Sequence, residues 1–118
     1  RLGVAAGADP MTLAGLAGMG DMIATCYSEL SRNRRVGEQL AQGLTLNQVR
    51  HVMKNVAEGI DTTAAALQLS ERLSVDMPIT QATHSILFKG TSLESVISDL
   101  LGRRLTPELT GLDRKGKD

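Results

Sequence analysis

The sequence predicts an all-α fold, a multi-helix bundle built from about six to eight short helices. Apolar residues recur at helical spacing through most of the 118 residues, and no segment alternates apolar and polar residues as a strand would. Helix-capping and helix-ending residues divide the chain at short intervals. With one Phe, one Tyr and no Trp, the core of this single domain must be built from Leu, Ile, Val, Ala and Met.

The composition disfavours several classes of function. Thirteen basic and thirteen acidic side chains cancel, which disfavours a dedicated binder of nucleic acid or of an anionic membrane. A single cysteine excludes an internal disulfide and a cysteine zinc cluster, and it fits a cytoplasmic location. No apolar run approaches the roughly 20 residues of a membrane span. We expect no metal site and no signal peptide.

The first ten residues, RLGVAAGADP, have the pattern of a helix already under way, which Gly7 ends. Since there is no initiator Met, we expect that an upstream half of the protein is missing from this chain. Asp9 and Pro10 then supply the N-cap and the first residue of a short helix over 11–16.

A glycine-rich corner follows, in which Gly15, Gly18 and Gly20 allow positive φ angles or the close approach of another segment. Asp21 stands directly after it, inside the apolar segment 19–26. A carboxylate among apolar residues needs a cation or several hydrogen-bond donors. Asp21 is therefore a candidate to hold a lysine or a substrate hydroxyl, and the alternative is an ordinary N-cap.

The next helix is predicted over 32–42, with Ser31 as its N-cap and Gly43 as its end, after a loop over 27–30. Its start is a candidate anion site, because a helix N-terminus presents unpaired N–H groups and the positive end of the dipole.

Three arginines crowd the first turn of this helix, at Arg32, Arg34 and Arg35. Cations there oppose the helix dipole, so a bound anion would offset their cost. Arg32 can form a bidentate fork with a phosphate, and Asn33 offers both a donor and an acceptor. The alternative is a solvated basic turn.

Thr45 is the predicted cap of a third helix with apolar residues at Leu46, Val49, Val52, Met53 and Val56. A break is expected over 55–59, and the next helix is expected to start at Asp61 or Thr62.

Two further helices complete the predicted bundle. Pro78 opens one that Gly90 ends, and Ser92 caps another that Gly102 ends. We expect a domain over 1–105 and a loose tail over 106–118.

Three residues with reactive side chains are given structural roles. Cys26 is expected to be a small packed residue, His51 to face solvent, and His84 to be exposed or satisfied in the core and not a metal ligand.

Several motifs in order resemble one family. They are AGMGDM, the pair Thr25-Cys26, SRNRRVG, VAEG at Val56–Gly59 and MPI at Met77–Ile79. The chain, from about Ala5 to Gly102, resembles the C-terminal domain of bacterial-type NAD(P)-dependent glycerol-3-phosphate dehydrogenase. The resemblance implies a helical domain similar to that of 6-phosphogluconate dehydrogenase, joined in the full enzyme to an N-terminal Rossmann domain.

The implied activity is the interconversion of sn-glycerol 3-phosphate and dihydroxyacetone phosphate by an oxidoreductase, with NAD or NADP bound mainly by the absent domain, in phospholipid biosynthesis. The family's proton-accepting lysine lies before the GxGD corner, and no lysine precedes Asp21 here. The resemblance therefore implies that the chain alone is inactive.

By the same resemblance, particular residues take particular roles. Asp21 matches the acid beside the absent lysine and binds substrate. The other implied substrate contacts are Thr25, Ser31, Arg32 and Asn33, and the implied cofactor contacts are Arg32, Val56 and Glu58.

A second hypothesis is a free-standing helical module that binds an anion or self-associates without catalysis. A homodimer is a related hypothesis, because the face that meets the missing domain would be exposed. Nucleic acid is not an expected partner.

Overall fold

The computed structural model describes residues 1–53, 57–107 and 110. Across these residues the secondary structure is helical and contains no strand, which confirms the all-α prediction. The elements are α1 (Leu2–Ala5), α2 (Pro10–Ala14), the π-helix η1 (Leu16–Gly20), α3 (Asp21–Tyr27), α4 (Arg32–Ala41), α5 (Leu46–Val52), α6 (Glu58–Arg72), α7 (Pro78–Lys89) and α8 (Leu93–Leu101).

Local capping chemistry sets several of the helix starts, as the sequence predicts. The hydroxyl oxygens of Ser31, Thr45 and Ser92 each accept a hydrogen bond from the backbone N–H three residues later, at 3.2, 3.3 and 3.2 Å. Gly43 and Gly90 adopt φ angles of +91° and +67° after α4 and α7. These left-handed residues end their helices, as expected.

The glycine-rich corner confirms the predicted close approach but has none of the predicted positive φ angles. Gly15, Gly18 and Gly20 all avoid positive φ, and the chain passes through a π-helical turn in which the Gly20 N–H donates to the Gly15 carbonyl at 3.2 Å. Glycine is needed at position 18 for space, because a Cβ there would lie 2.0 Å from the Leu13 carbonyl oxygen. The corner is thus a close backbone approach at Gly18 without any left-handed residue.

The start of α6 was also predicted wrongly. The helix begins at Glu58, three residues before Asp61. Ala57 has no side-chain acceptor to cap it, and the acceptor comes from another helix, since the Gly59 N–H donates to Asn33 Oδ1 at 3.2 Å. Residues 55–56 of the expected break lie outside the described residues, as do 108–109 and 111–118 of the expected tail.

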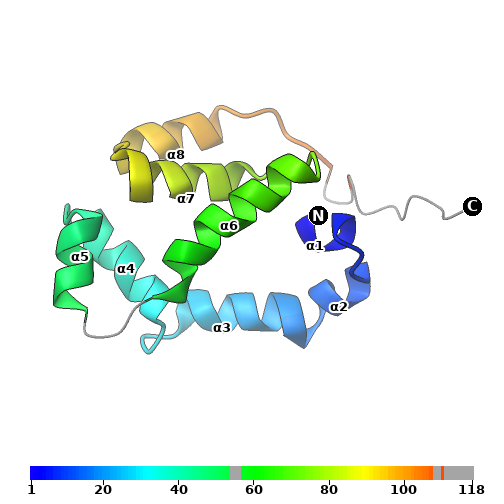
Figure 1. The fold of residues 1–118 in the computed structure, drawn as a ribbon, viewed down its shortest axis with the longest axis horizontal. Coiled ribbons are helices and arrows are strands. Elements are labelled where there is room, and N and C mark those ends of the chain that lie inside the picture. Colours follow the sequence, from blue (N-terminus) through cyan, green and yellow to red (C-terminus); the bar gives the residue numbers. More distant parts are fainter. Residues whose placement is uncertain (54–56, 108–109, 111–118) are drawn as a thin grey trace, which may run out of the picture.

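The buried core lies where α4, α5, α6 and α7 meet. Figure 1 shows α6 crossing the middle of the molecule, with α7 and α8 along one side and α4 and α5 at one end. The core residues are Val36, Val49, Ala57, Ile60 and Leu87, with the partly buried Leu40, Leu44, Leu46 and Met53 packed against them.

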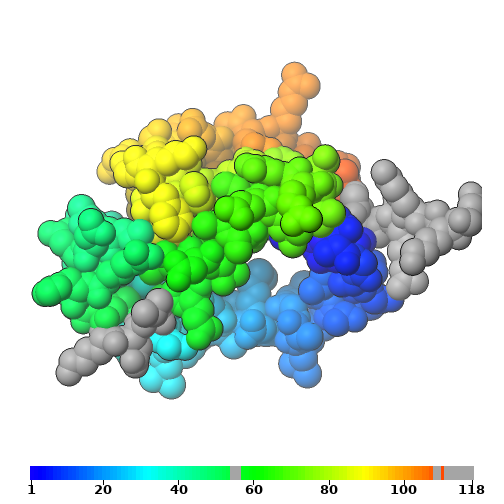
Figure 2. Space-filling model, in the orientation of Figure 1, coloured from blue at the N-terminus to red at the C-terminus, as the bar shows by residue number. Residues whose placement is uncertain are grey.

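The first 30 residues form a different region, which we call the arm: α1, α2, η1 and α3. In Figure 1 the arm runs along the side of α6 opposite to α7 and α8, and in Figure 2 an opening separates much of it from α6. Many of its apolar side chains face solvent, among them Leu16 at 90% and Tyr27 at 83% exposure. Cys26 is exposed as well, so the prediction of a packed cysteine was wrong.

The molecule exposes much more surface than a compact monomer would. Its accessible area is 9160 Å², against about 6200 Å² expected for a compact protein of 12.6 kDa. Its principal extents are 52 × 30 × 23 Å. Among the described helices, none is both long and apolar enough to cross a membrane.

Candidate functional site

The loop between α3 and α4 is fixed by two of the three clustered arginines. Arg34 donates through Nη1 to the Tyr27 carbonyl and through Nε to Glu38 Oε1 at 2.7 Å. Arg35 donates through Nε to the Glu29 carbonyl at 3.2 Å. Because carbonyls at the C-terminal end of a helix carry partial negative charge, these contacts offset the cost of cations in a first helical turn.

The start of α4 retains unused donors. The Ser31 hydroxyl accepts from the Arg34 N–H, which is the third of the first-turn amides. The amides of Arg32 and Asn33, at the first two helical positions, have no carbonyl within the helix to bond to. They lie at the positive end of a ten-residue helix.

The start of α6 meets the start of α4. Asn33 Oδ1 accepts from the Gly59 N–H at 3.2 Å, and Arg32 Nη2 lies 3.8 Å from Glu58 Oε1. The side chains of Arg32 and Glu58 are 49% and 84% exposed. An ion pair this exposed is worth at most about 1 kcal/mol, so the Arg32 guanidinium can turn to another anion at low cost.

A cavity of about 340 Å³ opens at this junction. It gathers on one surface four of the predicted substrate residues and two of the predicted cofactor residues, with Arg32 belonging to both sets. The lining residues are Ala24, Thr25, Ser28, Leu30, Ser31, Arg32, Asn33 and Glu58.

Asp21 stands beside this cavity but does not line it. It occupies the first position of α3, and helical spacing puts it on the same face as Thr25, one turn closer to the start of the helix. Both Gly20 and Asp21 have helical angles, so the N-cap alternative for Asp21 is wrong. Its carboxylate forms no hydrogen bond or ion pair within 1–53, 57–107 and 110.

Other predicted site features fall outside what the structure describes or outside this cavity. Val56 belongs to the undescribed residues. His51 is exposed, as predicted, and the His84 ring packs against Phe88 with centroids 4.8 Å apart and ring planes tilted by 41°. No cluster of three or more potential metal ligands occurs in the described part of the chain.

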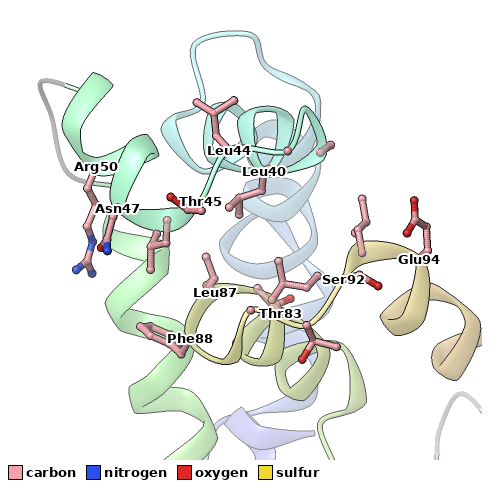
Figure 3. A pocket seen from close by; sticks show the side chains of 18 residues that line it. Leu40, Leu44, Thr45, Asn47, Arg50, Thr83, Leu87, Phe88, Ser92 and Glu94 are labelled. Atoms are coloured by element: carbon pink, nitrogen blue, oxygen red, sulfur yellow. The ribbon is translucent and has the colours of Figure 1, made fainter.

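A larger cavity, of about 890 Å³, lies elsewhere, between α4 and α5 on one side and α7 and α8 on the other (Figure 3). Its lining mixes aliphatic side chains, such as the labelled Leu40 and Leu87, with polar ones. The arginine in its lining, Arg50, lies 3.5 Å from Asp61 in an exposed ion pair similar to that of Arg32 with Glu58. Helix starts line both cavities, those of α5 and α8 in the larger one. The smaller cavity is the better candidate because it brings together the predicted site residues Arg32, Asn33 and Glu58, which can orient a ligand.

Three residues at the site were not predicted from the sequence: Ser28, Leu30 and Gly59. Ser28 and Leu30 line the cavity because α3 ends at Tyr27 and the loop turns back under α4. Gly59 contributes through its backbone N–H and its missing Cβ, as shown below. Ser28 and Leu30 belong to the segment 27–30, which was predicted only as a loop. Gly59 directly follows Glu58, which was predicted as a cofactor contact.

Comparisons with a family model and with individual proteins indicate the same family. Residues 1–98 match the family described as NAD-dependent glycerol-3-phosphate dehydrogenase C-terminus. A glycerol-3-phosphate dehydrogenase [NAD(P)+] of Prosthecochloris aestuarii is 50% identical over 109 residues, which are 92% of this chain and 33% of that protein. The corresponding protein of Frankia casuarinae is 50% identical over 108 residues, covering 92% of this chain and 32% of its own length.

A solved structure has the same fold. The crystal structure of a glycerol-3-phosphate dehydrogenase from Coxiella burnetii superposes with a TM-score of 0.83 at 33% sequence identity, over 87% of this chain and 32% of that one. The chain thus spans about a third of the length of the relatives that it matches.

Proposed function

Because this chain belongs to the family of NAD-dependent glycerol-3-phosphate dehydrogenase C-termini, we propose that it is the substrate-binding domain of such an enzyme. The reaction is the interconversion of sn-glycerol 3-phosphate and dihydroxyacetone phosphate, in glycerophospholipid synthesis. The observation that carries the proposal is the meeting of the N-termini of α4 and α6 at one cavity, with Arg32 and Asn33 on its surface.

The phosphate of the substrate is assigned to the start of α4. The amides of Arg32 and Asn33 and the helix dipole favour an anion there. The Arg32 guanidinium adds a charge-assisted hydrogen bond by leaving Glu58. Thr25 and Ser31 place hydroxyl groups on the same surface, where they suit the glycerol hydroxyls.

The dinucleotide is assigned to the open rim of the cavity. Arg32 and Glu58 fit this role because both side chains are substantially exposed and project a donor and an acceptor from adjacent helix starts. Val56 is proposed for the same contact on the strength of the family resemblance alone. When bound, NAD or NADP would supply the hydride chemistry, and most of its binding energy would come from a Rossmann domain.

Asp21 is proposed to hold the cationic base that takes the substrate's hydroxyl proton. Its carboxylate lies outside the cavity on the polar face of α3, where a lysine from elsewhere in the enzyme can reach it. Since no lysine precedes Asp21 in this chain, we propose that the chain alone has no turnover. We propose a cytoplasmic location, no nucleic-acid partner, and a homodimer formed through exposed apolar surface.

The experiment joins the chain to the amino-terminal two-thirds of its Prosthecochloris aestuarii relative. We expect this chimera to reduce dihydroxyacetone phosphate with oxidation of NADH or NADPH, and the chain alone to be inactive. In parallel, NMR of the 118-residue chain should show glycerol 3-phosphate, but not glycerol, shifting signals from residues 25, 28 and 31–33.

Two outcomes would contradict the proposal. Shifts confined to the larger cavity would remove the α4 start from the binding site. Phosphate binding at the α4 start with an inactive, folded chimera would favour the alternative of an anion-binding module without catalysis. Light scattering of the chain tests the homodimer.

A further inference from the structure

The contact between Asn33 and Gly59 joins two helices that are 26 residues apart in sequence. A backbone N–H can donate only to an oxygen, so this hydrogen bond fixes the side-chain amide of Asn33 with Oδ1 toward α6. The Nδ2 amine must then point away from the Gly59 N–H. Within the described residues no acceptor is bonded to Nδ2, so its two hydrogens are available to a ligand in the cavity that Asn33 lines.

The absence of a side chain at position 59 is a condition for this arrangement. A Cβ built on Gly59 would lie 2.5 Å from Asn33 Oδ1, 2.8 Å from its Cγ and 3.1 Å from its Nδ2. All three distances are below ordinary van der Waals contact. The obstacle is the flexible end of a side chain, so the fold itself does not forbid a Cβ, but Asn33 would have to swing away.

We infer that Gly59 is a positioning residue, which sets the orientation of the Asn33 amide toward the phosphorylated ligand. The inference rests on the proposed function for the identity of that ligand. It assigns Gly59 no contact with substrate or cofactor. Its role is to leave the space and to supply the N–H that together hold Asn33 in place.

Helix propensity predicts a different effect of the Gly59→Ala substitution than this inference does, so the substitution distinguishes the two. Gly59 lies in the first turn of α6 with φ outside the left-handed region, and alanine is preferred to glycine at ordinary helical positions. Propensity alone therefore predicts that Gly59→Ala is neutral or stabilising in every measurement. Gly37, inside α4 with no atom within 4 Å of an added Cβ, provides the matched control.

The experiment compares the wild-type chain with Gly59→Ala, Gly37→Ala, Asn33→Ala and the double variant Gly59→Ala/Asn33→Ala. Gly37→Ala should keep or raise the Tm, whereas Gly59→Ala should change it little, because the gain in helix propensity is offset by the loss of the hydrogen bond to Asn33. Only Gly59→Ala should shift the ¹H–¹⁵N signals of the Asn33 side-chain amide. It should also weaken binding of sn-glycerol 3-phosphate and of inorganic phosphate about tenfold or more, as the loss of a hydrogen bond to a charged group does.

The double variant distinguishes positioning from a merely structural effect. If Gly59 acts through Asn33, the double variant should bind no worse than Asn33→Ala alone. Additive losses, or unchanged Asn33 side-chain signals in Gly59→Ala, would overturn the inference. A wild-type chain that binds neither probe would overturn the proposed function and the ligand part of this inference with it, while the Asn33 signals would still decide whether Gly59 orients that side chain.

Discussion

The two regions of this molecule use their apolar residues differently. Where α4 to α7 meet, aliphatic side chains such as Val49, at 0% exposure, form a buried cluster. In the arm, apolar residues of similar size lie at the surface, with Met22 and Ile23 at 58% and 57% exposure. Helix α3 contacts the packed region through α4, and its larger apolar side chains stay more than half exposed.

The proposed site lies on the seam between these regions. The packed region supplies Arg32, Asn33 and Glu58 from helix starts that are anchored by the core, whereas the arm supplies Thr25 and Asp21. The phosphate-binding donors should therefore be in place in this chain, while the position of Asp21 depends on an arm with little buried surface. The following predictions test that division, beginning with the largest effect.

Two isoleucines give a matched test of the regions. Ile60 is 4% exposed in the core and Ile23 is 57% exposed in the arm. Ile60→Ala should lower the free energy of unfolding by about 2–5 kcal/mol, because it removes buried methyl groups and leaves a cavity. Ile23→Ala should change it by under about 0.5 kcal/mol, as exposed substitutions do. Urea denaturation measures both, and equal losses would show that the arm is as well packed as the core.

The second prediction concerns the Arg32 guanidinium, at the boundary between the two regions. Arg32→Ala should weaken binding of glycerol 3-phosphate by about 1.5–3 kcal/mol, because it removes a charge-assisted contact with the phosphate. Isothermal titration calorimetry measures the change. Arg35→Ala is the control, because Arg35 donates to the Glu29 carbonyl and does not line the cavity. Equal binding by the Arg32 variant and the wild-type chain would remove Arg32 from the site.

Sequence reasoning succeeded where the structure depends on local chemistry. The caps at Ser31, Thr45 and Ser92 require only a hydroxyl and an amide three residues later. The ends at Gly43 and Gly90 require only a residue that tolerates a left-handed backbone. Local chemistry also predicts an anion site at the start of α4, and this stays a prediction. The structure brings the predicted site residues Thr25, Ser31, Arg32, Asn33 and Glu58 to one cavity.

It failed where a distant segment supplies the partner. The start of α6 could not be placed because its acceptor, Asn33 Oδ1, comes from another helix. Arg34 and Arg35 were grouped with Arg32, yet they donate to the carbonyls of Tyr27 and Glu29. Only the folded chain brings these carbonyls close to them. Cys26 was expected to be packed because free cysteine is usually buried, and that rule assumes a covered helix face that the arm lacks here.

The third prediction separates two roles of one side chain. Asn33→Ala should cost about 1 kcal/mol of stability, since it leaves the Gly59 N–H without its acceptor, and it should also weaken phosphate binding. Asn33→Asp retains an acceptor, and a negative charge suits the start of α4 and of α6, so stability should be kept. It lacks the donor and repels an anion, so binding should still be lost. Thermal unfolding and phosphate titration of both variants measure this, and parallel changes in the two properties would mean that Asn33 has only the structural role.

The smallest expected effect on stability is that of substituting Asp21, which lies in the arm. Its carboxylate caps no helix and forms no ion pair within the described residues, so Asp21→Asn should change the free energy of unfolding by less than about 0.5 kcal/mol. In the chimera, the same substitution should depress turnover, because an amide no longer supplies the negative charge that a cationic base requires. Urea denaturation and a dinucleotide oxidation assay measure the two effects on the same protein, with Asp9→Asn as the control on the same arm. A variant that loses stability and activity together would mean that Asp21 holds the arm in place, and full activity with full stability would remove Asp21 from the proposed mechanism.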